Sequence, residues 1–192
     1  AYKNWVAEYA DTKVHDLLLS LIGKYLGFKK NVRILDVGCG PGKWSTLFAK
    51  WKVSVIGVDL SAGMIELANK KKRMLNLKNV DFCVMDAASL QFRDGIFDLV
   101  NCVTVLHHIF DDEKWKKAIH EMARVTKEGG YINIYEMAPL FFPLKRTRHL
   151  RIRKMREYVS EFKEAGSRLL CWRGTDLSYP LTLYGLLKYS SS

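Results

Sequence analysis

The segment Arg33–Trp44, with the sequence RILDVGCGPGKW, decides the fold. An apolar strand leads into glycines at 38, 40 and 42, a pattern typical of a turn that brings a ligand against the backbone between a strand and a helix. The carboxylate of Asp36, just before these glycines, would repel a pyrophosphate and attract a cationic amino group. Lys43 stands where the dinucleotide pattern G-x-G-x-x-G needs glycine. The turn therefore predicts a ligand that carries an ammonium group and no phosphate.

Strands and helices alternate along the rest of the chain, which predicts an α/β fold with a mainly parallel sheet covered by helices on both faces. The last two strands have no helix between them and are expected to pair antiparallel at one edge of the sheet. The expected strands are 32–37, 53–58, 80–85, 97–103, 131–137, 167–173 and 180–189, and the expected helices are 4–26, 42–50, 61–75, 111–126 and 150–165.

The length of 192 residues predicts a single domain over 1–192. No apolar run reaches the roughly 18 residues of a membrane span, and no secretory leader pattern is visible at the start. The cysteines lie far apart and are expected to be buried and reduced, which suits the cytoplasm and leaves no metal site. They are Cys39, Cys83, Cys102 and Cys171.

Acidic residues end several of the expected strands, and the carboxyl ends of parallel strands meet at one edge of a sheet, where ligands bind. Asp59 is placed to accept hydrogen bonds from both hydroxyls of a ribose, although a helix cap is the alternative, a role that Ser61 fills better. Asp86 could accept from an adenine amino group while the backbone N–H of Ala87 donates to a ring nitrogen; a turn cap is the alternative there. Together with Asp36, these acids predict a nucleoside site with an amino-acid arm.

These residues lie in longer stretches that resemble class I S-adenosylmethionine-dependent methyltransferases, the group that includes ubiquinone, sterol and many small-molecule methyltransferases. The matching stretches are LDVGCGPG (35–42), GVDLSAGMIELA (57–68), MDAASLQFRDGIFDLV (85–100), VLHHI (105–109) and EMARVTKEGGYINI (121–134). The resemblance implies a Rossmann-like sheet of seven strands in the order 3-2-1-4-5-7-6, the seventh antiparallel. It also implies methyl transfer as the activity, S-adenosylmethionine as the cofactor and S-adenosylhomocysteine as the product.

The resemblance further implies a set of cofactor contacts. Glycines of the turn would allow close approach of the methionine part, Met64 would lie near the adenine, and Val103 would line the pocket near the sulfonium. The N-terminal segment 1–28 would fold over the cofactor as a helical lid, with Tyr9 or Trp5 touching it; core packing is the alternative for both aromatics. The expected cofactor-binding residues are Asp36, Gly38, Cys39, Gly40, Asp59, Leu60, Met64, Asp86, Ala87, Val103 and Tyr9.

Three residues near the expected acceptor side are candidates for catalysis. The transfer needs an acceptor lone pair held in line with water excluded, and a base helps if the acceptor is a hydroxyl or a protonated amine. His107 and His108 follow the fourth strand and titrate near neutral pH, although a structural role is the alternative for at least one of them. Glu136 ends the fifth strand and could act as a base or bind a cationic substrate; a solvated strand end is the alternative.

The acceptor itself is predicted only by class. The stretch NCVTVLHH lacks both the Asn/Asp-Pro-Pro-aromatic signature of base-amine methyltransferases and the Pro-Cys of RNA cytosine C5 enzymes, which favours a small or medium-sized molecule. Residues 138–156 are expected to form a substrate-side cap. It combines an apolar wall, Leu140, Phe141, Phe142 and Leu144, with a basic strip, Lys145, Arg146, Arg148, Arg151, Arg153, Lys154 and Arg156.

The positive charge of the chain allows an alternative acceptor, RNA. The formal net charge is +11, and the part from Leu140 onward holds 11 Lys/Arg against 4 Asp/Glu. A basic C-terminal third could dock RNA, as some tRNA methyltransferases resemble the chain at FRDGIFDLVNCVTVLHH, or it could be a solvated surface without a partner. A third reading is a cofactor-binding protein without transfer activity.

Overall fold

The computed structural model describes residues 20, 23–24, 31–137, 151–173 and 182–190. Its strands are β1 (Arg33–Val37), β2 (Ser54–Asp59), β3 (Val80–Val84), β4 (Phe97–Val103), β5 (Thr126–Met137), β6 (Ser167–Arg173) and β7 (Thr182–Tyr189). Its helices are α2 (Lys43–Ala49), α3 (Ala62–Met74), α4 (Asp112–Val125) and α5 (Met155–Glu164), with a 3₁₀ turn, η1, at Leu106–His108.

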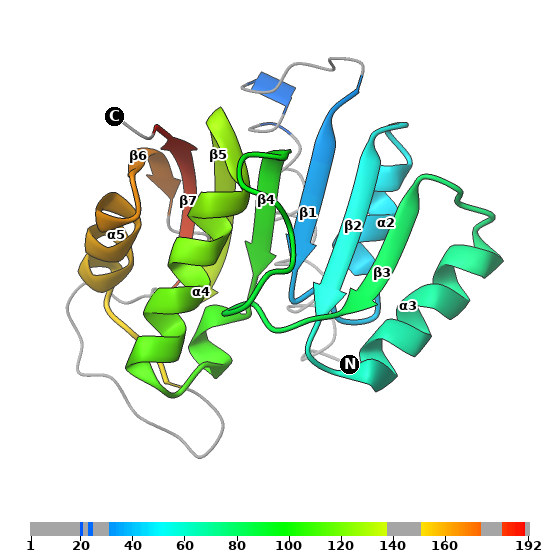
Figure 1. Cartoon of the computed structure of the whole chain (residues 1–192), viewed down its shortest axis with the longest axis horizontal. Coiled ribbons are helices and arrows are strands. Elements are labelled where there is room, and N and C mark those ends of the chain that lie inside the picture. Colours follow the sequence, from blue (N-terminus) through cyan, green and yellow to red (C-terminus); the bar gives the residue numbers. More distant parts are fainter. Residues whose placement is uncertain (1–19, 21–22, 25–30, 138–150, 174–181, 191–192) are drawn as a thin grey trace, which may run out of the picture.

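The seven strands form one sheet in the order β3-β2-β1-β4-β5-β7-β6 (Figure 1). β7 runs antiparallel to both of its neighbours, and the other pairs are parallel. The predicted Rossmann-like sheet is therefore confirmed, including its strand order and its antiparallel seventh strand. The parallel strands bring their carboxyl ends, and the segments that follow them, to one edge of the sheet.

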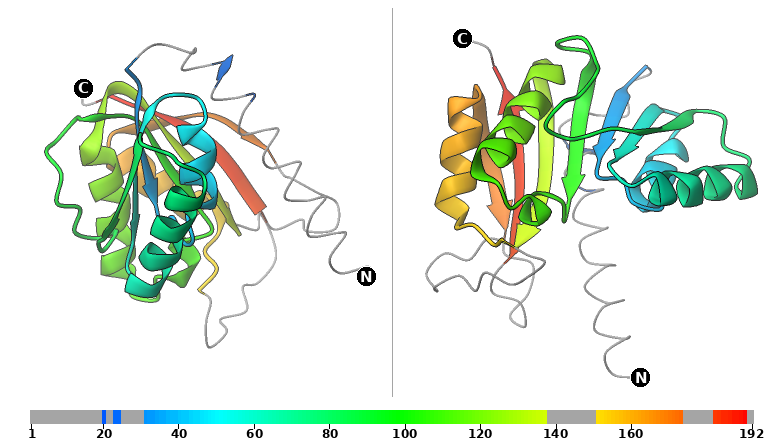
Figure 2. Two further views of the ribbon diagram at one scale, coloured as in Figure 1. Left: turned by 90° about the vertical axis from the view of Figure 1, so that its right-hand side faces the viewer. Right: turned by 60° about the horizontal axis from the view of Figure 1, so that its bottom comes forward.

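Helices pack against both faces of the sheet (Figure 2). Successive strand residues point to opposite faces, so Ile34 and Leu35 enter two different hydrophobic clusters. The cluster with Ile34 includes Phe48 of α2, and the cluster with Leu35 includes Ile119 of α4 and Phe162 of α5. These two cores hold the strand ends rigidly, which is what a precise ligand site requires.

Local signals explain where the helices begin and end. The Ser61 hydroxyl caps α3 by accepting the Met64 N–H at 3.4 Å, and the Asp111 carboxylate caps α4 by accepting the Lys114 N–H at 2.7 Å. Lys71, Lys72 and Arg73 lie in the last turn of α3, where cations suit the helix dipole. The basic run at 70–73 is therefore a feature of the helix end, as predicted.

Two predicted boundaries are wrong. β5 begins at Thr126 instead of residue 131, because its register against β4 shifts between the pairs Phe97–Thr126 and Leu99–Tyr131, which accommodates Gly129 at a φ of +72°. The glycine pair thus lies inside an irregular strand and does not end a helix. Residues 151–154 are extended, so α5 starts at Met155, five residues after the predicted start.

Several predictions lie outside the described residues: the side chains of Tyr9 and Trp5, most of the predicted helix 4–26, and the segment 138–150 of the proposed cap. Within the described ranges, no helix has the length and apolar character needed to cross a membrane.

Candidate functional site

The glycine turn after β1 combines a close packing contact with an open surface. Gly38 has a φ of +65°, and a Cβ there would lie 2.2 Å from a methyl of Val105, so only glycine fits. Gly40 also has a positive φ, +51°, but a Cβ there would meet no atom of the described residues within 4 Å. The described residues therefore leave space beside Gly40, whereas Gly38 packs against the segment that follows β4.

Asp36, on β1 beneath this turn, is a buried carboxylate held by side chains. The Ser45 hydroxyl of α2 donates to Oδ2 at 2.5 Å, and the Asn101 amide of β4 donates to Oδ1 at 2.7 Å. Burial raises the pKa of Asp36 to about 6, against these two hydrogen bonds and one from the Ser45 backbone N–H, which lower it, and the nearby charge of Asp59 adds to the rise. A cationic ligand at this position would offset that cost of burying a negative charge.

The Asp36 carboxylate belongs to a polar row that crosses three strands. Asp36 lies in register with Asn101 of β4, and Asn101 lies in register with Asn133 of β5. The Asn133 amide donates to Asn101 Oδ1 at 2.6 Å, and Asn101 donates in turn to Asp36. Sequence reasoning missed both asparagines. The available signal was an asparagine inside each of two apolar strands, NCV and INI, where an unpaired amide would be costly.

Asp59 links the second strand to the glycine turn. Its Oδ2 accepts the Gly40 N–H and its Oδ1 accepts the Ser61 N–H, both at 2.9 Å. The carboxylate is only partly buried, and the adjoining apolar side chains Leu60 and Met64 are 67% and 40% exposed. The structure thus brings Asp36, the glycine turn, Asp59 and this exposed apolar pair to the same edge of the sheet.

Asp86 lies after β3 and is already engaged. Lys114 of α4 lies 2.7 Å from its Oδ2, and the Ala88 N–H donates to Oδ1 at 3.0 Å. Burial acts the other way, but these hydrogen bonds and the charge of Lys114 hold the pKa of Asp86 below its usual value. Ala87, between Asp86 and Ala88 in the sequence, is half-buried. Any ligand that uses the Asp86 carboxylate must therefore share it with Lys114.

The segment after β4, residues 104–109, is here called the post-β4 turn. It follows the half-buried Val103, and it contains η1. Thr104 adopts a φ of +57°, which is unusual for a β-branched residue. His108 is exposed, whereas His107 is buried, and their rings lie 4.3 Å apart. Of the two candidate histidines, only His108 presents its side chain to solvent.

Glu136 is not a solvated strand end. It is fully buried and lies beneath the post-β4 turn, where Oε1 accepts the N–H groups of Val105 and Leu106, both at 2.7 Å. Its Oε2 lies 2.5 Å from Nδ1 of His107. The three candidate catalytic residues are thus close together, but Glu136 and His107 are turned toward the protein interior.

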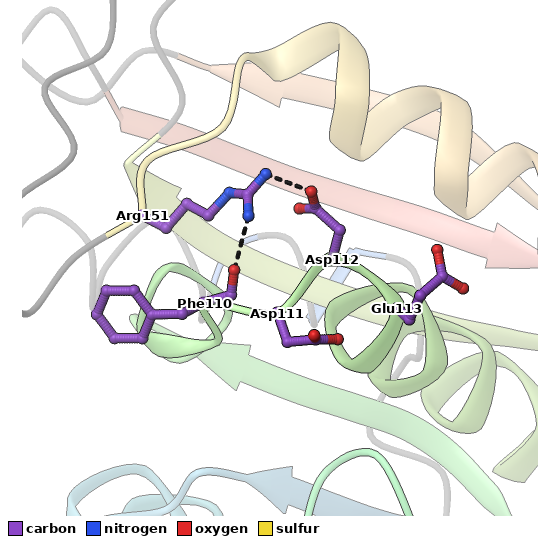
Figure 3. A pocket seen from close by; sticks show the side chains of 5 residues that line it. All are labelled: Phe110, Asp111, Asp112, Glu113 and Arg151. Atoms are coloured by element: carbon purple, nitrogen blue, oxygen red, sulfur yellow. Dashed lines mark hydrogen bonds and ion pairs between the residues drawn. The ribbon is translucent and has the colours of Figure 1, made fainter.

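Two arginines expected in the basic strip are held by the protein itself. Arg151 binds the Asp112 carboxylate, and its guanidinium also donates to the Phe110 carbonyl at 2.7 Å. Arg151, Asp112 and Phe110 border a hollow of about 470 Å³ at the start of α4 (Figure 3). Arg153 is buried, lies 2.9 Å from Asp112 and stacks over the Trp115 ring. Their hydrogen bonds hold the pKa of Asp112 below its usual value, although its slight burial acts the other way.

The cysteines differ in how deeply they are buried. Cys39 and Cys102 are buried, and burial raises the pKa of both. Cys83 is exposed on the edge strand β3, so the prediction of a buried thiol there is wrong. In the ranges that the structure covers, no group of three His, Cys, Asp or Glu side chains could hold a metal ion.

Comparison with known proteins identifies the family. A family model described as a methyltransferase domain matches residues 34–130, half of the chain. The chain belongs to this methyltransferase family. The predicted class I S-adenosylmethionine-dependent methyltransferase is thereby confirmed at the level of family and fold, and S-adenosylmethionine is the cofactor of such enzymes.

Among the relatives of this methyltransferase, a demethylmenaquinone methyltransferase of Renibacterium salmoninarum is 32% identical over 126 residues, 65% of this chain and 50% of the relative. A probable tRNA methyltransferase 9B of Bos taurus is 35% identical over 105 residues, 55% of this chain and 21% of the relative. The chain thus spans half or less of these two proteins. The crystal structure of magnesium protoporphyrin IX methyltransferase from Synechocystis, solved with S-adenosylmethionine bound, shares the fold, with a TM-score of 0.77 at 20% identity over 98% of this chain and 83% of that one.

Proposed function

We propose that this methyltransferase binds S-adenosylmethionine at the edge formed by β1 and β2 and transfers its methyl group to an acceptor beside the post-β4 turn. The observation that carries the proposal is the link between the two halves of the cofactor site. The Gly40 N–H binds Asp59, so the turn facing the amino-acid arm and the acid facing the ribose form one unit. Among the described residues, none fills the space beside Gly40, which fits a ligand that lies against the backbone.

In this proposal each residue contacts a defined part of the cofactor. Asp36 attracts the ammonium group through the turn, Asp59 accepts from the ribose hydroxyls, and the adenine lies by Leu60 and Met64. The other proposed contacts are Gly38, Cys39 and Gly40 for the methionine part, Asp86 and Ala87 for the adenine edge, Val103 for the region of the sulfonium, and Tyr9 from a lid formed by residues 1–28.

When bound, S-adenosylmethionine supplies an activated methyl group, and the acceptor lone pair bonds to the methyl carbon as the carbon–sulfur bond breaks and leaves S-adenosylhomocysteine. The chain's own contribution is to orient the acceptor and exclude water. His108 is the candidate to accept a proton from the acceptor, because it is the exposed histidine of the post-β4 turn. Residues 138–156 complete the acceptor side as a cap.

A small or medium-sized acceptor is the first candidate. Two residues of the basic strip, Arg151 and Arg153, both bind Asp112, so this one carboxylate offsets part of their combined charge within the protein. The relative named for demethylmenaquinone is in line with such an acceptor. A cytoplasmic location is part of the proposal and rests on the reduced, widely spaced cysteines.

RNA is the second candidate. The relative named as a tRNA methyltransferase and the net charge of +11 favour it. In this case the remaining basic residues of the C-terminal third would contact phosphates, and binding would weaken as salt rises.

The test is to incubate the pure protein with methyl-labelled S-adenosylmethionine and, separately, total RNA or a metabolite extract of the source cells. Label in the metabolite fraction supports the first candidate, and salt-sensitive label in RNA supports the second. Asp36→Asn is the test variant of the cofactor site. Its matched control is Asp81→Asn, which removes an exposed carboxylate of β3. Label in neither fraction, with S-adenosylmethionine still bound, would leave a binding protein without transfer activity.

A further inference from the structure

The post-β4 turn is held at several points by other parts of the chain. Val105 packs so closely against Gly38 that no Cβ fits between them. The Thr104 N–H donates to the Tyr135 carbonyl of β5 at 2.8 Å. On the outer side, the Arg151 N–H donates to the His107 carbonyl at 2.8 Å. The turn therefore touches the glycine turn, the end of β5 and the segment that leads into α5.

Glu136 and His107 lie at the centre of this arrangement. One carboxylate oxygen binds two consecutive backbone N–H groups of the turn, and the other binds the imidazole. With Glu136 as a carboxylate, which only accepts hydrogen bonds, Nδ1 of His107 is the atom that carries the proton between them. The imidazole is thereby fixed in one tautomer and one orientation.

His107 contacts two parts of the chain: the end of β5 and the segment that leads into α5. Glu136 binds its ring one residue before β5 ends at Met137, and Arg151 binds its carbonyl where the described chain resumes. Two arginines extend this junction. The Arg151 guanidinium reaches the Phe110 carbonyl (Figure 3), and the Arg153 guanidinium reaches the Leu106 carbonyl. His107 is thus bound through its side chain from one direction and through its backbone from another.

We propose that Glu136 and His107 form a buried positioning pair, which sets the conformation of the post-β4 turn and so places His108 against the acceptor. This inference rests on the proposed function and refines it, because neither buried residue then acts as the base. The strained Thr104 agrees with this role, since an unfavourable φ persists only where the surroundings enforce it. The pair acts on the acceptor side, while Asp36 and Asp59 continue to bind the cofactor.

The test uses Glu136→Gln. Glutamine keeps one oxygen for the N–H groups of Val105 and Leu106, but its amide then donates to the imidazole, so His107 must move its proton from Nδ1 to Nε2. The matched control is Glu161→Gln. Glu161 is also a buried glutamate bound to a histidine, His120, at 3.0 Å, but it lies between α4 and α5, away from the turn.

Three readouts separate positioning from general stability. Nitrogen-15 NMR of labelled histidine should show Nδ1–H in the wild type and Nε2–H at His107 in Glu136→Gln. Calorimetry should show unchanged affinity for S-adenosylhomocysteine. Transfer of label into the fraction that the wild type labels should fall roughly tenfold or more, with the loss in kcat, because misplaced reacting groups slow the chemical step. Glu161→Gln should keep the wild-type rate.

Other outcomes overturn the proposal. A wild-type rate in Glu136→Gln with the tautomer exchanged would show that the turn does not depend on the pair. An equal loss in Glu161→Gln would indicate a general effect on stability, and a parallel loss of S-adenosylhomocysteine affinity would place the pair on the cofactor side. If the wild type labels neither fraction, the proposed function fails, while the histidine tautomer decides whether the pair exists: Nε2–H at His107 in the wild type refutes it.

Discussion

Asp36 and Glu136 are both buried carboxylates at the carboxyl ends of parallel strands, but the protein treats them differently. Asp36 receives one hydroxyl and one amide from side chains, and burial leaves its pKa raised to about 6. Glu136 receives two backbone N–H groups at 2.7 Å and an imidazole. The protein stabilises the negative charge of Asp36 only in part. The carboxylate of Glu136 is bound by groups of the protein whose positions it fixes in turn.

In the proposed function, this difference would separate a binding group, Asp36, from a structural one, Glu136. A raised pKa means that the folded protein disfavours the charge of Asp36, so a cationic ligand can supply the missing stabilisation. Both oxygens of Glu136 already bind N–H groups of the protein, so its carboxylate has partners without a ligand. We therefore expect removal of the two carboxylates to change stability in opposite directions.

Glu136→Leu should have the largest effect. The substitution leaves the N–H groups of Val105 and Leu106 and the His107 imidazole buried without their acceptor. Breaking a buried pair in this way destabilises a protein by roughly 3–5 kcal/mol. Urea denaturation at pH 7 measures the change, and a loss no greater than that of Glu161→Leu would remove the special status of Glu136.

Asp36→Asn should stabilise the free protein. Asparagine can keep both side-chain hydrogen-bond partners, because the Ser45 hydroxyl accepts as well as donates, and its Oδ1 remains an acceptor for an N–H group. The change removes a charge whose pKa is raised by about two units, which corresponds to about 3 kcal/mol at pH 7. Affinity for S-adenosylhomocysteine should nevertheless fall more than about tenfold, or 1.4 kcal/mol. A destabilised variant would contradict the comparison.

The pH dependence has a definite sign. A folded pKa of about 6, above the ordinary 3.8, means that the folded protein holds the Asp36 proton more tightly than the unfolded chain does. This contribution to stability is present below pH 3.8 and is lost as pH rises toward 6. Cofactor affinity should show the opposite trend and fall as pH drops below about 6, since the neutral acid no longer attracts an ammonium group. Asp36→Asn should lack this dependence in calorimetric titrations.

The sequence predicts the local surroundings of Asp36 better than those of Glu136 for a physical reason. Asp36 stands beside glycines whose spacing limits both the turn and its ligand, so local pattern is sufficient. Glu136 follows an apolar strand in the same way, but its partners are backbone groups about 30 residues away, which no side-chain pattern reveals. The strand order followed from the family resemblance, whereas the bulge at Gly129 and the late start of α5 depend on tertiary pairing.

The polar row beside Asp36 shows the same limit. Asn101 and Asn133 become neighbours only through the registers of β4 with its two partners. Cys83 was expected to be buried by its apolar neighbours, but β3 is the edge strand and exposes that face. The strand order implied by the resemblance already places this strand at an edge, but the apolar pattern of its five residues does not show that position.

Asn101→Leu should weaken cofactor binding by a smaller amount. The hydrogen bond from Asn101 lowers the pKa of Asp36, so its loss should raise that pKa above about 6 and move the pH dependence of S-adenosylhomocysteine binding to higher pH. The free energy of unfolding should fall by about 1–3 kcal/mol, because the Asn133 amide loses its acceptor. Carbon-13 NMR of the Asp36 carboxyl gives the pKa directly, and an unchanged value would exclude a tuning role for the polar row.

Lys114→Met should have the smallest effect and tests whether Asp86 resembles Asp36 or Glu136. Lys114 is about half exposed, and such surface ion pairs contribute about 0–1 kcal/mol, so stability should hardly change. The pKa of Asp86 should rise toward its ordinary value, and its carboxylate becomes free to accept from an adenine amino group. If Asp86 is a binding group, affinity for S-adenosylhomocysteine should rise slightly at pH 7. If the affinity falls instead, Lys114 holds Asp86 in its binding position. The Lys114–Asp86 ion pair would then have a positioning role, as proposed for His107 and Glu136.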